Sequence, residues 1–205
     1  MALSWLLANM VFNVANAQTR EKTILSFGDS LMAGYGIPYA EAFPAQLEKK
    51  LQAEGYSVRV INAGVSGDTT SGGLTRLAWV LDQQKPDFVI LELGANDMLR
   101  AIDPKVTRDN LQKMLEILQQ RKIPVLLAGM KAAPNLGGSF TKNYPKMYED
   151  LSRKFHTGYY PFFMEGVTFH SDLILEDGLH PNPSGIAVIV EGILPQVKKM
   201  LDAQK

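Results

Sequence analysis

The chain has 205 residues, of which 46% are hydrophobic and 20% charged, the composition of an ordinary globular protein with the length of one domain. Its 21 Lys and Arg balance its 21 Asp and Glu, which argues against a nucleic-acid partner and favours a small neutral ligand. The absence of cysteine from the sequence excludes disulfides, thiolate nucleophiles and cysteine-bound metals. Any covalent catalysis must therefore use another nucleophile.

The first 17 residues differ in character from the rest of the sequence. They are largely apolar and end in Ala15-Asn16-Ala17, a small-residue pattern typical of a signal-peptide cleavage site. No Lys or Arg precedes the apolar run and two asparagines interrupt it, so an ordinary amphipathic segment is the alternative. The run is too short and too polar to span a bilayer. We expect a signal peptide at residues 1–17, a single domain at 18–205, and a periplasmic or secreted protein without a stable membrane anchor.

From Thr23 onward, short apolar runs alternate with longer segments of helical periodicity. This alternation is typical of βαβ units, which build a parallel sheet with helices on both faces. The apolar runs lack a regular polar alternation, as expected of strands that are buried on both sides. We therefore predict an α/β fold with strands at Thr23–Phe27, Val58–Asn62, Phe88–Leu93 and Pro124–Gly129, and a weaker fifth strand at Tyr159–Met164.

Apolar residues at helical spacing predict crossover helices between these strands. They lie around Phe43–Leu51, Leu74–Leu81, Leu111–Leu118 and Tyr144–Phe155, with a last helix over Ser184–Leu201. Thr70 or Ser71 is the expected N-cap of the second helix, and Pro195 should break or kink the last one. No repeat or linker divides the chain, so the loops that follow the strands should meet at one edge of one sheet, where such folds bind ligands.

Ser30 follows the first strand in the segment Ser26-Phe27-Gly28-Asp29-Ser30-Leu31. A hydroxyl at a turn from strand to helix is well placed for a nucleophile, because helix N–H groups face it. Asp and Ser are also the usual helix caps, so a purely structural role is the alternative for this segment alone.

Two more loops add candidate hydrogen-bond donors at the same edge. Gly67, in the turn-rich loop after the second strand, offers an unobstructed backbone N–H, and Asn96, after the third strand, offers a side-chain amide. Taken singly, Gly67 is better explained as a turn glycine and Asn96 as a turn or cap residue.

Asp177 and His180 lie three residues apart near the C-terminus, close enough to build a base and its orienting acid in one turn. A capping Asp beside a surface His is the alternative. His156 and His170 have no comparably placed acid and are interpreted as structural or surface residues. No pair of histidines has metal-ligand spacing, so we expect no metal and no cofactor.

Together these loops would supply a hydroxyl nucleophile, a base, an orienting acid and oxyanion donors, which are the parts needed for acyl transfer. Four of their segments closely resemble the motifs of the SGNH (GDSL) hydrolases and occur in the same order. They are FGDSLMAGYG, NAGVSGDTTSGGL, ELGANDMLR and DGLHPN. The resemblance is to the bacterial branch of arylesterases, thioesterases and lysophospholipases. The resemblance runs from Thr23 to about Pro195. It implies a flavodoxin-like three-layer α/β/α sandwich with a five-stranded parallel sheet.

The same resemblance implies roles for individual residues. Ser30 would be the nucleophile, with Asp177 and His180 completing the triad, and the N–H of Ser30 and Gly67 with the Asn96 side chain would form the oxyanion hole. The absence of a G-x-S-x-G motif separates the chain from the α/β-hydrolases. We expect hydrolysis of aryl or short- to medium-chain acyl esters, with acyl thioesters and lysophospholipids as further substrates.

Met98, Leu99 and Ile102 follow the Asn96 motif and are the candidate walls of the acyl pocket, together with a loop at Pro134–Tyr144; plain packing is their alternative role. Two other functions remain open on the sequence. One is a carbohydrate-ester deacetylase on the same scaffold, and the other a non-catalytic binding module that uses the glycine-rich turns to hold a phosphate or flavin. The latter leaves the Asp177 and His180 pair unexplained. The sequence leaves the oligomeric state open.

Overall fold

The computed structural model describes residues 20–132 and 138–203, so the predicted signal peptide at residues 1–17 lies outside the described residues. The strands are β1 (Lys22–Gly28), β2 (Val58–Gly64), β3 (Phe88–Glu92), β4 (Val125–Ala128) and β5 (Gly158–Tyr160). The helices are α1 (Ser30–Ala33), α2 (Phe43–Ala53), α3 (Thr70–Gln84), α4 (Ala95–Leu99), α5 (Pro104–Gln120), α6 (Gly138–Phe155) and α7 (Pro183–Asp202), with a 3-10 turn η1 (Tyr39–Glu41).

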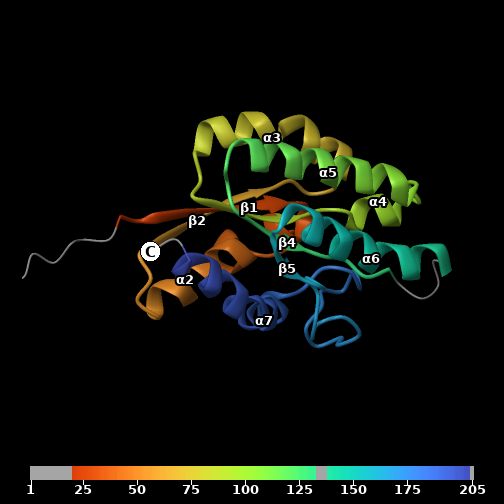
Figure 1. The fold of residues 1–205 in the computed structure, drawn as a ribbon. Coiled ribbons are helices and arrows are strands. Elements are labelled where there is room, and N and C mark those ends of the chain that lie inside the picture. The colour runs from red at the N-terminus through yellow and green to blue at the C-terminus, as the bar shows by residue number, and fades with distance from the viewer. Residues whose placement is uncertain (1–19, 133–137, 204–205) are drawn as a thin grey trace, which may run out of the picture.

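The five strands form one parallel sheet in the order β2-β1-β3-β4-β5. Helices α3 and α5 cover one face of this sheet and α2 and α7 cover the other (Figure 1). The strand order is that of the flavodoxin-like folds, in which the order reverses at the first strand. The predicted α/β/α sandwich with five parallel strands is confirmed.

Burial explains why the periodic segments became helices and strands. All five residues of β3 are buried, and the apolar stripe Phe43, Leu47 and Leu51 of α2 is fully buried against the sheet. Each such side chain contributes about 1.5–3 kcal/mol to folding when it leaves water. The first four predicted strands are confirmed to within two residues at each end.

The fifth strand was predicted too long. It overlaps the expected segment only at Tyr159 and Tyr160, because Pro161 has no N–H with which to continue the ladder. The chain then turns, and the N–H of Phe163 donates to the carbonyl of Gly129. Phe163 is nevertheless fully buried, so its hydrophobicity reflects core packing in a loop.

The helices differ from the predictions at two places. The N-cap of α3 is Thr69, whose hydroxyl accepts from the N–H of Gly72, whereas the Thr70 hydroxyl donates to Asp97. Of the break or kink predicted at Pro195, the break is wrong, since α7 runs continuously from Pro183 to Asp202, and the kink stays a prediction. Buried Ile193, Leu194 and Val197 hold α7 against the sheet on both sides of the proline.

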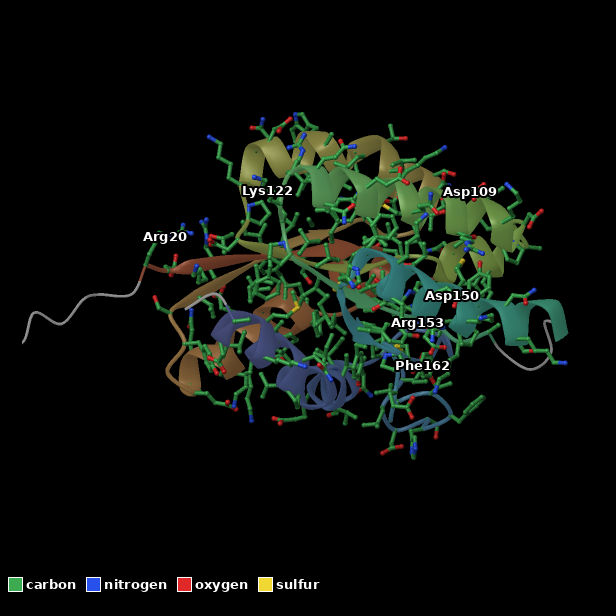
Figure 2. The ribbon with its side chains drawn as sticks, viewed as in Figure 1. Arg20, Asp109, Lys122, Asp150, Arg153 and Phe162 are labelled. Carbon is green, nitrogen blue, oxygen red and sulfur yellow. The ribbon has the colours of Figure 1, made fainter. Side chains whose placement is uncertain are left out.

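The carboxyl ends of the parallel strands define one edge of the molecule. Figure 2 shows Arg20 and Lys122, which precede β1 and β4, toward the opposite side from Asp109 near the start of α5 and from Asp150 and Arg153 on α6. Loops that follow β1, β2 and β3 therefore share the edge on the α6 side. Within the described ranges, no helix combines the length and apolar character needed to cross a membrane.

Candidate active site

Ser30 is the first residue of α1, directly after the turn that ends β1. The preceding residue, Asp29, is the N-cap of this helix, and its Oδ1 accepts from the N–H of Leu31 at 3.0 Å. Gly28 is required by close approach, because a Cβ there would lie 2.5 Å from the carbonyl oxygen of Glu92. The capping role that the sequence suggested for this segment therefore belongs to Asp29, while the Ser30 hydroxyl turns elsewhere.

The structure brings Ser30, His180 and Asp177 together in series. The Nε2 atom of His180 lies 2.8 Å from the Ser30 Oγ, and the Nδ1 atom lies 2.6 Å from Oδ2 of Asp177. These distances are normal for hydrogen bonds, so the nucleophile, base and acid of the expected triad are in direct contact.

The loop that carries His180 is fixed by its own hydrogen bonds. Oδ1 of Asp177 accepts from the backbone N–H groups of Leu179 at 2.9 Å and of His180 at 3.0 Å. Partial burial raises the pKa of Asp177, but these bonds and the His180 side chain outweigh it and lower the pKa to about 2. Asp177 is therefore ionised at neutral pH, as the acid that orients an imidazole must be.

Tyr35 packs its ring on the His180 imidazole, with ring centroids 4.5 Å apart and planes tilted by 36°. The tyrosine side chain is half exposed, so it covers one face of the imidazole at the surface. Sequence reasoning missed this residue, although it stands within the FGDSLMAGYG segment. Its position only five residues after Ser30 could have indicated that Tyr35 lies near the site.

Asn96 lies beside the turn that carries Ser30, and Gly67 is in the loop after β2, whose last residue, Gly64, pairs with Gly28 of β1. The Asn96 side-chain amide donates to Oδ2 of Asp29 at 3.0 Å. Gly67 has a φ of 79°, the left-handed conformation that favours glycine, and its carbonyl accepts from Arg100 at 2.8 Å. The loop before Gly67 is tied to β1 because the N–H of Val65 donates to Gly28.

Asp97 joins the helices α3, α4 and α5 and is fully buried. Its carboxylate accepts from the backbone N–H and the hydroxyl of Thr70, at 2.8 and 2.5 Å, and from the Thr107 hydroxyl at 3.2 Å. Asp97 therefore fixes the start of α3 against α4 and α5. Asp97 stands in the ELGANDMLR motif, but this role was not predicted from the sequence.

Two buried carboxyls lie beneath the Ser30 turn. Burial raises the pKa of Asp29 to about 6, against the lowering effect of hydrogen bonds from Leu31 and Asn96 and of the His180 charge. Burial also raises the pKa of Glu92 well above its ordinary value, and the neighbouring Asp29 raises it further. The burial of Glu92, which ends an otherwise apolar strand, was not predicted from the sequence.

The candidate pocket residues lie in three different environments. Met98 is buried in the hydrophobic core, Leu99 is exposed, and Ile102 is partly buried. The expected loop at Pro134–Tyr144 is a helix from Gly138 onward, since α6 begins there. Among residues 20–132 and 138–203, no cluster of His, Asp and Glu side chains could hold a metal ion.

Comparison with known proteins relates this geometry to a family. The profile of the GDSL-like Lipase/Acylhydrolase family matches residues 26–188. An arylesterase from Vibrio mimicus is 36% identical over 192 residues, covering 94% of this chain and 96% of that protein. The thioesterase 1/protease 1/lysophospholipase L1 of Escherichia coli K12 is 34% identical over 180 residues, covering 88% and 85%.

A solved structure agrees with these relatives. The esterase EstA from a Pseudoalteromonas species, inhibited by monoethylphosphonate, superposes with a TM-score of 0.83 at 34% identity, and the alignment covers 89% of this chain and all of that one. The family profile covers more than half of the chain, and both sequence relatives span nearly its whole length. The chain therefore belongs to the GDSL-like lipase/acylhydrolase family, also known as the SGNH hydrolases.

Proposed function

We propose that this serine ester hydrolase forms an acyl-enzyme on Ser30, with His180 as general base and Asp177 as the acid that orients the imidazole. The unbroken series of hydrogen bonds from Asp177 through His180 to the Ser30 hydroxyl supports this assignment. His180 takes the hydroxyl proton while Oγ attacks the carbonyl carbon of the ester. The protonated ring then gives this proton to the leaving alcohol, and water releases the acyl group by the same route.

The proposed oxyanion hole consists of the backbone N–H groups of Ser30 and Gly67 and the side-chain amide of Asn96. One N–H of this amide is bonded to Asp29, beside the nucleophile, and the amide nitrogen carries a second hydrogen that we assign to the oxyanion. Preorganised donors of this kind stabilise the negative charge that develops on the carbonyl oxygen.

The proposed substrates are aryl esters and esters with short or medium acyl chains, followed by acyl thioesters and lysophospholipids. Relatives named as an arylesterase and as a thioesterase and lysophospholipase support this range. Exposed apolar side chains flank the site at Tyr35, Val65, Leu99 and Leu179 and suit an apolar acyl or aryl group. We retain Met98 and Ile102 as candidate substrate-binding residues beside Leu99.

A substrate panel tests this proposal. Turnover of p-nitrophenyl esters of increasing chain length, of acyl thioesters and of acetylated sugars is measured with the wild type and with Ser30→Ala. We expect the wild type to favour the aryl and short-chain esters, and Ser30→Ala to lose hydrolysis of all of them. Preference for acetylated sugars would instead support the deacetylase alternative, and an active Ser30→Ala would contradict the assignment of the nucleophile.

We further propose export to the periplasm or the medium, on the basis of the apolar segment at residues 1–17 and its small-residue end. Expression of the full chain in a Gram-negative host, followed by N-terminal sequencing of the protein in the periplasmic fraction, tests this point. A mature protein that begins at Gln18 is the expected result. An uncleaved protein confined to the cytoplasm would contradict it.

A further inference from the structure

Glu92 is a buried acid beneath the active site that the proposed reaction steps do not use. Its side chain at the end of β3 is fully buried, and among residues 20–132 and 138–203 its Oε1 atom has no hydrogen-bond partner. Its Oε2 atom lies 3.4 Å from the backbone N–H of Asp29. No ion pair within those ranges reaches this carboxyl. An ionised carboxylate in such a place would carry a large desolvation cost, so the neutral acid is favoured.

A neutral carboxyl has an O–H that needs an acceptor, and the Asp29 side chain supplies one. Burial first, and then the charge of Asp29 and a hydrogen bond to its side chain, favour the protonated form of Glu92 and raise its pKa well above the ordinary value; because no donor from the described residues reaches Oε1, Glu92 can make this bond only as the donor. The Glu92 side chain packs directly under Gly28, where a Cβ would lie 2.5 Å from Oε2. The two acids thus form a close pair below the turn that carries Ser30.

Asp29 connects this pair to the oxyanion hole. Its Oδ2 atom accepts from the Asn96 amide at 3.0 Å, and its Oδ1 atom accepts from Leu31. If the O–H of Glu92 also donates a hydrogen bond to it, the Asp29 carboxylate would be held by Glu92 as well as by Asn96 and Leu31. Because an amide with one fixed N–H has its second N–H fixed too, the direction of the Asn96 donor depends on where Asp29 is held.

We propose that Glu92 is a positioning residue: its neutral carboxyl donates a hydrogen bond to Asp29, which in turn holds the Asn96 amide in the direction of the oxyanion. This inference rests on the proposed role of Asn96. The arrangement places a single negative charge, shared by two carboxyls, under the site. Glu92 touches no reacting atom and acts only through Asp29.

The test compares Glu92→Leu, which removes the donor, with Glu92→Gln, which keeps the shape and an N–H donor. On a p-nitrophenyl ester, we expect Glu92→Leu to lower kcat by about 10- to 100-fold with KM nearly unchanged, because positioning of a transition-state donor is lost. Glu92→Gln should lose only about threefold, because a neutral donor is retained. Equal losses in the two variants would overturn the proposal.

A double-mutant comparison separates positioning from general damage. In the Asn96→Ala background, Glu92→Leu should have little further effect on kcat, because its effect passes through Asn96. Fully additive losses would overturn the role of Glu92 while leaving Asn96 in the oxyanion hole. An Asn96→Ala enzyme as active as the wild type would instead overturn the proposed oxyanion donor, and the Glu92 inference with it.

Infrared spectroscopy decides the question if Glu92→Leu does not fold. At pH 8, where Asp29 is ionised, the folded wild type should show the carbonyl band of a neutral carboxylic acid, and Glu92→Gln should lack it. A wild-type spectrum without such a band would overturn the proposal.

Discussion

The Nε2 atom of His180 lies 2.8 Å from the Ser30 Oγ, although the two residues are 150 positions apart in the chain. Ser30 is held by a buried strand and a short capped helix. The His180 loop is held by a hydrogen bond from the N–H of Leu175 to the carbonyl of His180 and by a bridge between Ile174 and Pro181. Both partners are therefore fixed before substrate arrives, which is the condition for efficient general-base activation of a hydroxyl.

Replacing Ser30 by Ala removes the proposed nucleophile. We expect kcat for ester hydrolysis to fall by about 10⁶-fold, the scale of triad removal in serine hydrolases. The free energy of unfolding should hardly change, because Ser30 is not a helix cap and the substitution removes only one hydroxyl from a small side chain. Steady-state kinetics and urea unfolding of the purified variant measure both quantities, and substantial residual turnover would contradict the assignment.

Replacing Asn96 by Ala removes one proposed oxyanion donor. We expect kcat to fall by about 10²- to 10³-fold, or ~3–4 kcal/mol of transition-state stabilisation, with a small change in KM. The kinetics are measured on a p-nitrophenyl ester. Unchanged kcat together with a raised KM would show that Asn96 binds substrate in its ground state and is not an oxyanion donor.

Asp177→Asn tests the orienting acid. The amide would keep the shape of the loop, because its oxygen can still accept from Leu179 and His180, but its NH₂ group would face Nδ1 and favour the wrong tautomer. We expect kcat to fall by about 10⁴-fold, as for the corresponding acid of serine protease triads. Glu176→Gln, a substitution at the exposed neighbour, is the matched control and should retain full activity. A comparable loss in the control would indicate damage to the loop.

Tyr35→Ala removes the ring that lies on the His180 imidazole. Aromatic pairs of this kind contribute about 0.5–1.5 kcal/mol, so we expect kcat/KM to fall by about 2- to 10-fold. Tyr35→Phe keeps the ring and should behave as the wild type. Tyr39→Ala, at a more exposed tyrosine in η1, is the control. Loss of activity in Tyr35→Phe would assign the effect to the hydroxyl.

The raised pKa of Glu92 predicts how stability depends on pH. In the unfolded chain Glu92 ionises near its ordinary pKa of 4.5, whereas burial raises its pKa well above that value in the folded protein, where we propose the neutral form. Unfolding therefore releases a proton, so this residue lowers stability as pH rises until it titrates in the folded state. Glu92→Gln lacks this effect. Its free energy of unfolding, relative to the wild type, should increase between pH 7 and 8 by at most about 1.4 kcal/mol.

Urea unfolding at pH 7 and pH 8 measures this difference. The other titratable groups that face Glu92 are Asp29, whose pKa of about 6 lies below this range, and Tyr148, whose pKa burial raises well above its ordinary value. Neither changes its charge greatly between the two pH values. A stability difference that stays constant would show that Glu92 is ionised in the folded protein.

Much of the scaffold followed from the sequence because burial on both faces of a sheet leaves a clear pattern. The fully buried β3 and the stripe of α5 at Leu111, Leu115 and Leu118 were predicted from apolar runs and spacing alone. Pro161 and Pro195 show where such patterns fail. Pro161 ended β5 early, whereas Pro195 left α7 continuous, because tertiary packing decides whether a helix tolerates a missing N–H.

The site was predictable to the extent that short motifs carry its chemistry. Ser30, Asn96, Asp177 and His180 each stand in a motif next to a strand end or in the final loop. The second layer of contacts was not predictable. Glu92 looks like an exposed charge at the end of an apolar run, and its burial depends on how the turn at Gly28 and the neighbouring helices close over it.

The central claim, that Ser30 is the nucleophile activated by His180, is tested most directly by labelling the folded enzyme with a fluorophosphonate and mapping the modified peptide by mass spectrometry. Esters of this class react with serine only where the hydroxyl is activated. One phosphonyl group on Ser30, with labelling abolished in Ser30→Ala and strongly slowed in His180→Ala, is the predicted result. No labelling of the active wild type, or modification at another residue, would contradict the account.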